Sequence, residues 1–107
     1  MDMHFEAKSR LGKIIRTTYS HWELITKIKH PEIDGKETEV KECLSNPIEI
    51  RKSSEDHDVY LYYSQYMLYY ICVVARHLNG DGFIITAFFV SRFERLLARG
   101  ILWQRKS

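Results

Sequence analysis

Apolar and polar positions in the first half of the chain predict a short strand followed by two helices. Residues 12–18 have the pattern of an extended segment. Ser20 and Glu23 have the spacing of a capping box, in which a hydroxyl and a carboxylate satisfy free backbone donors at a helix start. Apolar residues then recur at helical spacing, and this helix is expected to end near His30, because a proline follows it. A second helix is expected over residues 35–44.

The second half of the chain changes from helical spacing to strands. Residues 48–51 alternate between apolar and charged side chains, as a strand with one buried face does. Three further runs are rich in β-branched and aromatic residues, and the glycines within residues 79–82 favour a turn before the last of them. The four expected strands cover residues 48–51, 59–64, 66–77 and 82–90. Apolar residues from Phe89 to Leu97 return to helical spacing and predict a short C-terminal helix.

This order of elements predicts an α+β fold. The N-terminal helices are expected to pack on a four-stranded antiparallel sheet, with a short C-terminal helix or tail after it. Strict alternation along the last strand places Ile84, Thr86 and Phe88 on one face of that sheet. A length of 107 residues suits one core, so residues 1–107 are expected to form a single domain.

Composition places the chain among globular proteins of a reducing compartment. Hydrophobic residues make up 45% of the sequence and charged residues 28%. The longest apolar stretches fall far short of the roughly 20 residues that a membrane span needs, and the first residues lack the pattern of a secretion signal. Cys43 and Cys72 show no metal-type spacing and are expected to be two buried thiols. We therefore expect a cytoplasmic protein without a membrane segment.

The distribution of charge leaves two interpretations open. The net charge is only +2, but basic residues gather toward both ends of the chain and acidic ones between residues 32 and 42. The basic residues are Lys8, Arg10, Lys13 and Arg16 near the N-terminus, and Arg92, Arg95, Arg99, Arg105 and Lys106 near the C-terminus. They can be solvated faces of amphipathic elements, or they can contact an anionic polymer laid across both ends.

Several short motifs occur in a recognisable order over most of the chain. They are His21-Trp22, His30-Pro31-Glu32, Asn46-Pro47 leading into residues 48–53, residues 70–74, Gly82-Phe83-Ile84-Ile85-Thr86-Ala87-Phe88, and Gly100-Ile101-Leu102-Trp103. In this order the chain resembles the phage-type branch of the barnase–EndoU–colicin–RelE ribonuclease superfamily, from about Ile14 to Trp103. Two positions depart from the family's pattern: Leu24 stands where a second helix histidine is expected, and Phe88 where tyrosine is more usual.

The resemblance implies a metal-independent endoribonuclease that needs no cofactor. In such a family the helices pack on the sheet, and the sheet surface holds the scissile phosphate. The family's polar positions correspond here to His30, Arg51 and Thr86. We expect His30 to act as general acid or base, Arg51 to bind the phosphate at the transition state, and Thr86 to position it through its hydroxyl. Lys52, Tyr63 and Ser91 are expected to contribute to substrate binding.

These residue types suit the chemistry of RNA cleavage without a metal. The reaction needs a base for the ribose 2′-hydroxyl, an acid for the leaving oxygen and cations around the phosphorane. Histidine suits either proton role because its pKa, about 6.5, lies near working pH. A guanidinium grips two phosphate oxygens at once. Threonine donates a hydrogen bond but is too weak an acid to serve as a good base.

Each candidate also has a purely structural interpretation. His30 can cap the end of a helix, Arg51 can be an ordinary exposed charge, and Thr86 a buried strand threonine. His21 lies on the apolar stripe of its helix and is expected to be packed rather than catalytic, and His57 to lie in a solvated loop. The tyrosines of the middle strands are either half-buried packing residues or a stacking platform for unpaired bases.

Two functions therefore follow from the sequence. The first is a small endoribonuclease, acting as a toxin or in phage–host conflict, with RNA as its substrate and an antitoxin protein as its partner. The second is a nuclease-like module that has lost catalysis and binds RNA or a protein. The resemblance along most of the chain favours the first, whereas the Leu24 and Phe88 departures favour the second.

Overall fold

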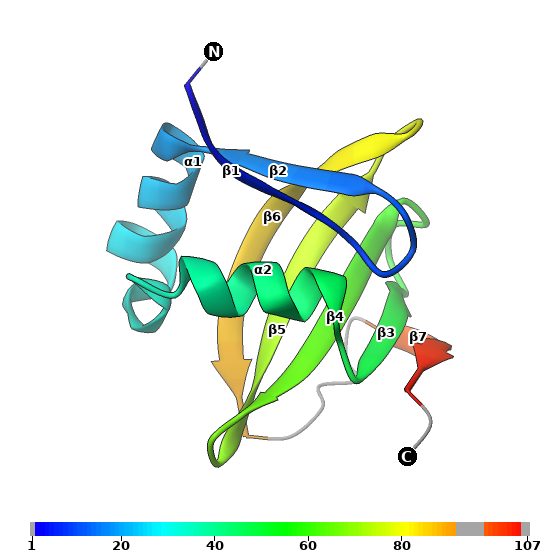
Figure 1. Cartoon of the computed structure of the whole chain (residues 1–107). Coiled ribbons are helices and arrows are strands. Elements are labelled where there is room, and N and C mark those ends of the chain that lie inside the picture. Colours follow the sequence, from blue (N-terminus) through cyan, green and yellow to red (C-terminus); the bar gives the residue numbers. More distant parts are fainter. Residues whose placement is uncertain (1, 92–97, 106–107) are drawn as a thin grey trace.

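A twisted mixed sheet of seven strands forms the body of the protein. The computed structural model describes residues 2–91 and 98–105. The strands run in the spatial order β1-β2-β6-β5-β4-β3-β7, and all neighbours are antiparallel except β2 and β6 (Figure 1). Their bounds are Met3–Lys8 (β1), Ile14–Thr18 (β2), Glu49–Ser53 (β3), Val59–Tyr66 (β4), Tyr69–His77 (β5), Asp81–Val90 (β6) and Ala98–Gln104 (β7).

The expected fold class is wrong. The sheet has seven strands rather than four, and it includes the parallel pair β2–β6. The strand at residues 14–18 belongs to this sheet, and β1 adds a further strand beside it. At the other edge, Ala98–Gln104 form β7 instead of a tail. Phe89, the first residue of the expected C-terminal helix, lies in β6, and its other apolar residues lie outside the described ranges.

Four helical segments connect β2 to β3. They are α1 (Tyr19–Glu23), the π-helix η1 (Leu24–Lys29), the 3₁₀ turn η2 (Pro31–Ile33) and α2 (Glu37–Ser45). The expected end of the first helix at His30 is confirmed, since His30 is the C-cap of η1. Its expected start is wrong by two residues: Thr18 is the N-cap, and its side chain accepts a hydrogen bond from the His21 backbone N–H at 3.2 Å.

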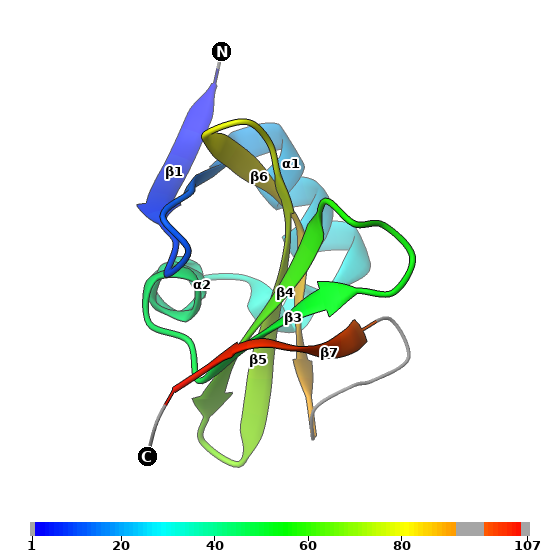
Figure 2. The ribbon, with the colours of Figure 1, turned by 90° about the vertical axis from the view of Figure 1, so that its right-hand side faces the viewer.

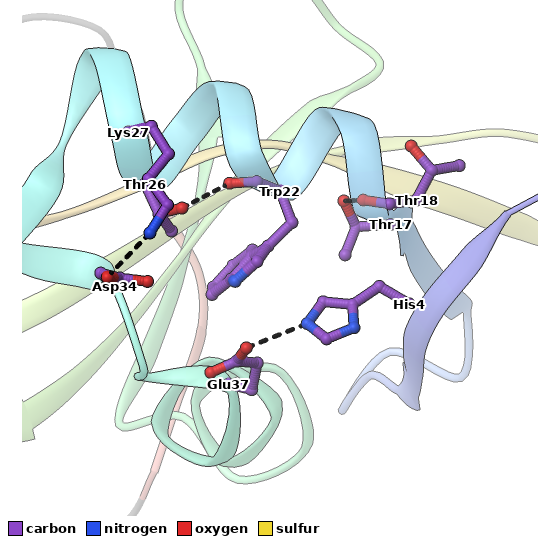
Figure 3. Close-up of polar contacts among 8 residues, drawn as sticks. All are labelled: His4, Thr17, Thr18, Trp22, Thr26, Lys27, Asp34 and Glu37. Carbon is purple, nitrogen blue, oxygen red and sulfur yellow. Dashed lines mark hydrogen bonds and ion pairs between the residues drawn. The ribbon is translucent and has the colours of Figure 1, made fainter.

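Polar contacts fasten this helical layer to the first strand (Figure 3). His4 Nε2 lies 2.9 Å from a Glu37 carboxylate oxygen and so joins β1 to α2. The Thr26 hydroxyl donates to the Trp22 carbonyl at 3.0 Å, one turn earlier, within the widened helix. Partial burial raises the pKa of Glu37, but the hydrogen bonds from His4, from the backbone and from Trp22, together with the charge of His4, outweigh it and the net shift is downward. The contact between His4 and Glu37 therefore favours the ionised carboxylate of Glu37.

Side chains on the two faces of the sheet form two separate clusters. On the first face, which we call the helix-side face, strand residues such as Ile15, Tyr62 and Ile84 pack with Trp22 and Val40 of the helices. Figure 2, seen from the side, shows α2 on this side of the central strands. The second cluster contains only strand and loop residues, which are Leu61, Tyr63, Cys72, Ile48, Val74 and Phe88. We call the sheet surface that bears it the far face.

The junction of β2 with β6 leaves no room for a side chain at Gly82. Ile15 of β2 stands opposite Gly82, and so does His77 of β5. A Cβ atom there would lie 2.2 Å from the Arg76 carbonyl oxygen and 2.9 Å from Ile15 Cδ1. The backbone oxygen cannot move away without breaking the ladder. Glycine at this position is therefore what allows three strands to meet.

We predict that Gly82→Ala lowers the free energy of unfolding by about 1–3 kcal/mol, the range found for overpacked interiors. Urea denaturation followed by circular dichroism measures the change. Gly100→Ala is the matched control, since nothing lies within 4 Å of its added Cβ. Equal stability of the two variants would contradict the proposed crowding at the β2–β6 junction.

A buried histidine lies under the end of the sheet on the helix-side face. His77 Nε2 is 2.8 Å from the Tyr62 hydroxyl, and its ring stacks on Tyr60 with centroids 3.9 Å apart. Burial, with a smaller contribution from the charge of Lys13, lowers the pKa of His77 to about 4. Burial also raises the pKa of Tyr62 to about 12. The pair is therefore neutral at pH 7.

This pKa predicts the direction of an acid destabilisation. The unfolded chain binds a proton at His77 below a pH of about 6.5, whereas the folded chain does so only near 4. The contribution of His77 to the free energy of unfolding is therefore fully present above pH 6.5. It is lost as the pH falls from 6.5 to 4, by on the order of a few kcal/mol. Denaturation midpoints measured across this range test the effect. His77→Gln should flatten the slope, and the control His57→Gln, whose side chain is 86% exposed, should leave it unchanged.

Two further expectations are met within the described ranges. Cys43 and Cys72 are free and fully buried, as predicted, and burial raises the pKa of the Cys43 thiol to about 12. His57 lies in an exposed loop, also as predicted. Among the described helices there is none with the length and apolar character required to cross a membrane.

Candidate functional site

A β-bulge in β6 determines which face Thr86 occupies. Val74 pairs with Thr86 but Ala75 pairs with Ile84, so Ile85 has no partner on β5. The extra residue interrupts the alternation of side chains. Ile84 consequently packs in the helix-side core, whereas Phe88, two positions beyond Thr86, packs in the far-face cluster. The expectation that Ile84 shares a face with Thr86 and Phe88 is therefore wrong.

The bulge is held in place by His21. The Nε2 atom of His21, in α1, lies 2.9 Å from the Ile85 carbonyl oxygen. Because β2 pairs with β6 only as far as Phe83, the carbonyl of Ile85 has no neighbouring strand on that side. The imidazole N–H takes the place of that strand as the donor. His21 is thus a packed structural residue, as its position on the apolar stripe predicted.

Arg51 lies on the far face and is buried. Its side chain is 6% exposed and its Nε donates to the carboxylate of Glu49, two residues earlier on the same face of β3. The other oxygen of Glu49 accepts a 3.4 Å hydrogen bond from Gln104 of β7. Removing one partner of such a buried pair lowers the free energy of unfolding by far more than the intact pair contributes to it. The alternative interpretation of Arg51 as an ordinary exposed charge is therefore wrong.

His30 lies where η1 ends at the edge of the sheet. Its ring centroid is 5.2 Å from that of Phe88, and Nδ1 is 3.6 Å from a Glu32 carboxylate oxygen. The side chain is 32% exposed, so the imidazole is accessible to a substrate. The carboxylate can orient the ring. This is the arrangement of a proton donor or acceptor at a rim, beside an aromatic ring.

The register of the sheet places Arg51 and Thr86 on the same face, and His30 lies at the edge of that face. Arg51, Leu61, Val74 and Thr86 are directly opposite one another on four successive strands. The next row ends at Phe88, which the His30 ring contacts. Strands are about 4.8 Å apart, so the Arg51 and Thr86 backbones are separated by roughly 14 Å. The two side chains therefore face different parts of a bound molecule unless Arg51 swings along the face.

The other three predicted residues are dispersed. Tyr63 lies on the far face, fully buried, and burial raises the pKa of its hydroxyl well above the usual value, so it is protonated at neutral pH. Lys52 belongs to the helix-side face, where its Nζ is 5.7 Å from the centre of the Tyr60 ring. Ser91 is exposed just beyond the end of β6. Only Tyr63 joins the candidates on the far face.

Sequence reasoning missed two acidic residues beside these candidates. Glu49 neutralises Arg51, and Glu55 lines a cavity of about 300 Å³ that Thr86 also lines. Alternation in β3 could have placed Glu49 with Arg51, because residues two apart share a face. Nothing in the pattern could have placed Glu55, which lies in a loop. No group of three metal-binding side chains was found in the described ranges.

Comparisons with known proteins leave the family open. No protein-family model matches the chain, and neither a curated protein nor a solved structure matches it. The relationship to the ribonuclease superfamily accordingly stays a prediction from the motifs.

We predict that His21→Phe, which keeps a ring of similar size but removes the donor, lowers the free energy of unfolding by about 1 kcal/mol. Hydrogen exchange at the amides of residues 84–87 should accelerate because the bulge loses its support. The control His57→Phe, in an exposed loop, should change stability by less than about 0.5 kcal/mol. Unchanged exchange in His21→Phe would show that the bulge does not depend on this contact.

Proposed function

We propose that the protein is a metal-independent endoribonuclease whose substrate lies across the far face. A single observation supports the proposal: residues chosen from distant motifs come to one face of one sheet. Arg51 and Thr86 share a row of the register, and His30 contacts Phe88 in the next row. Had His30 and Arg51 faced opposite sides of the sheet, one bound RNA strand could not reach both of them.

In this proposal each side chain acts by its position. His30, accessible and paired with Glu32, transfers a proton at the edge of the face. Arg51 binds phosphate, and its guanidinium carries five N–H donors, of which the Nε–H donates to Glu49. Loss of that contact would leave a buried carboxylate unpaired, so we expect the pair with Glu49 to persist when phosphate binds.

The setting that we propose is the cytoplasm, with the nuclease acting as a toxin or in phage–host conflict. RNA is then the substrate, and an antitoxin protein is the partner that restrains it. These assignments follow from the motif resemblance. Growth arrest with RNA fragmentation on induced expression, relieved in the His30→Asn variant, would support them.

A second function is favoured by one specific contact. Arg51 is already engaged by Glu49, and Phe88 supplies a ring without a hydroxyl next to His30. Both features suit a nuclease-like module that binds RNA or a protein without cleaving it. In that case RNA is retained on the far face intact.

We predict that the purified protein cleaves single-stranded RNA in EDTA. His30→Asn should slow cleavage by about 10²-fold or more, the usual contribution of a general acid or base. Arg51→Lys, which keeps a charge beside Glu49 and so preserves folding, should slow it by about tenfold. A fluorescent RNA substrate and gel electrophoresis measure both rates.

Two control variants separate site effects from general ones. His57→Asn changes an exposed loop histidine, and Lys52→Ala changes a cation of the same strand as Arg51 on the opposite face. Both should cleave within about twofold of the original chain, the range of ordinary surface substitutions. RNA that is bound but never cleaved would select the binding module, and equal rates for His30→Asn and His57→Asn would refute the proton-transfer role.

A further inference from the structure

The cavity beside Thr86 on the far face has mainly apolar walls, which suit a ring. Its volume is about 300 Å³, at the lower end for small-molecule sites. Five of the residues that line it are apolar, and they come from three strands: Val59, Leu61, Val74, Ile85 and Phe88. Leu61 and Phe88 also belong to the far-face cluster, so they are fixed by packing. The cavity is therefore largely preformed.

One polar atom within this apolar lining has no partner. The Thr86 hydroxyl oxygen is buried and makes no hydrogen bond among the described residues. Buried hydroxyls are normally satisfied, so an orphan in a cavity wall indicates a polar atom that a ligand supplies. The bulge at Ile85 is what directs this side chain to the cavity rather than to the helix-side core. The structure thus combines an apolar cavity with one buried hydroxyl that has no hydrogen-bond partner among the described residues.

Carboxylates at the rim determine which ligands fit. Asp56 is engaged by Arg76 at 2.8 Å and by the Asp58 backbone N–H at 3.0 Å, and these hydrogen bonds lower its pKa. Glu55 is exposed, its backbone N–H is held by the Ser53 hydroxyl at 3.2 Å, and its carboxylate has no partner among the described residues. An anion such as phosphate would be repelled by Glu55, and the apolar walls would offer no hydrogen bonds in place of its lost water. A neutral ring bearing N–H donors is attracted by both features.

We infer that this cavity is a subsite for one unpaired nucleobase that carries an exocyclic amino group. The ring lies between Phe88 and the aliphatic walls, a polar edge atom meets the Thr86 hydroxyl, and the amino group donates to Glu55. The choice of a nucleobase among flat amino-bearing rings rests on the proposed function. The inference moves Thr86 from positioning a phosphate to binding a base, in agreement with its distance from Arg51.

Cytidine and uridine form a matched pair of probes, because they differ only at ring position 4, an amino group against a carbonyl, and at the adjacent N3, an acceptor in cytidine and an N–H donor in uridine. The chain is labelled at its methyl groups and titrated with each nucleoside to millimolar concentrations, and with inorganic phosphate. We expect cytidine to shift the methyl signals of Leu61, Val74 and Thr86 and to bind at least fivefold more tightly than uridine, whose carbonyl faces Glu55. Phosphate should leave these three signals in place.

Two substitutions test the two polar contacts separately. Thr86→Val removes the hydroxyl at constant shape and should weaken cytidine binding at least fivefold. Glu55→Gln should reduce the preference for cytidine over uridine to less than twofold, because an amide can donate to the uracil carbonyl. Thr17→Val, another buried strand threonine, and Glu23→Gln, an exposed glutamate of α1, are the controls and should bind like the original chain.

The outcomes distinguish failure of this inference from failure of the proposed function. Equal binding of cytidine and uridine, shifts confined to other residues, or phosphate-induced shifts at the three methyl groups would overturn the subsite. RNA cleavage without nucleoside binding in the cavity would overturn the subsite but leave the proposed ribonuclease activity intact. Cytidine binding without RNA cleavage would leave the subsite and select the binding module instead.

Discussion

The bulge at Ile85 is the constraint on which the candidate site depends. One extra residue in β6 lets Ile84 fill the helix-side core while Thr86 and Phe88 serve the far face. Without it, alternation would put Ile84 and Thr86 on the same face, so that either Thr86 would be buried among the helices or Ile84 would face the cavity. His21 satisfies the carbonyl that the bulge leaves without a strand partner. A helix residue thereby determines what the opposite face of the sheet presents.

The far face divides into a charged end and an apolar end. At β3, Glu49 and Arg51 form a buried ion pair. Near β6, the cavity of Thr86 is bounded by apolar walls and by the Glu55 carboxylate, which disfavour anions. A single-stranded nucleic acid has both kinds of group, with phosphates along one side and flat bases along the other. In the proposed function, the charged end meets phosphates and the apolar end meets a base.

The local sequence pattern was enough to predict the middle strands and α2. It failed for the elements that depend on pairing between distant segments. Residues 3–8 do alternate between apolar and polar side chains, so β1 was open to prediction, whereas β7 has a glycine and no regular alternation. The parallel β2–β6 pair joins segments far apart in the chain, which no local period can reveal. The candidates His30, Arg51 and Thr86 came from the motif resemblance. Glu49 and Glu55 became relevant only once register and loop placed them beside those residues.

The most direct test of this account is the through-space proximity of methyl groups in solution. In a methyl-labelled sample, nuclear Overhauser effects should join Thr86 to Val74 and Leu61, and should join Ile84 to Ile15 on the helix side. These contacts follow from the bulged register. Effects from Thr86 to Val73 or Ala75, with none to Val74, would contradict the bulge and with it the placement of the whole candidate site.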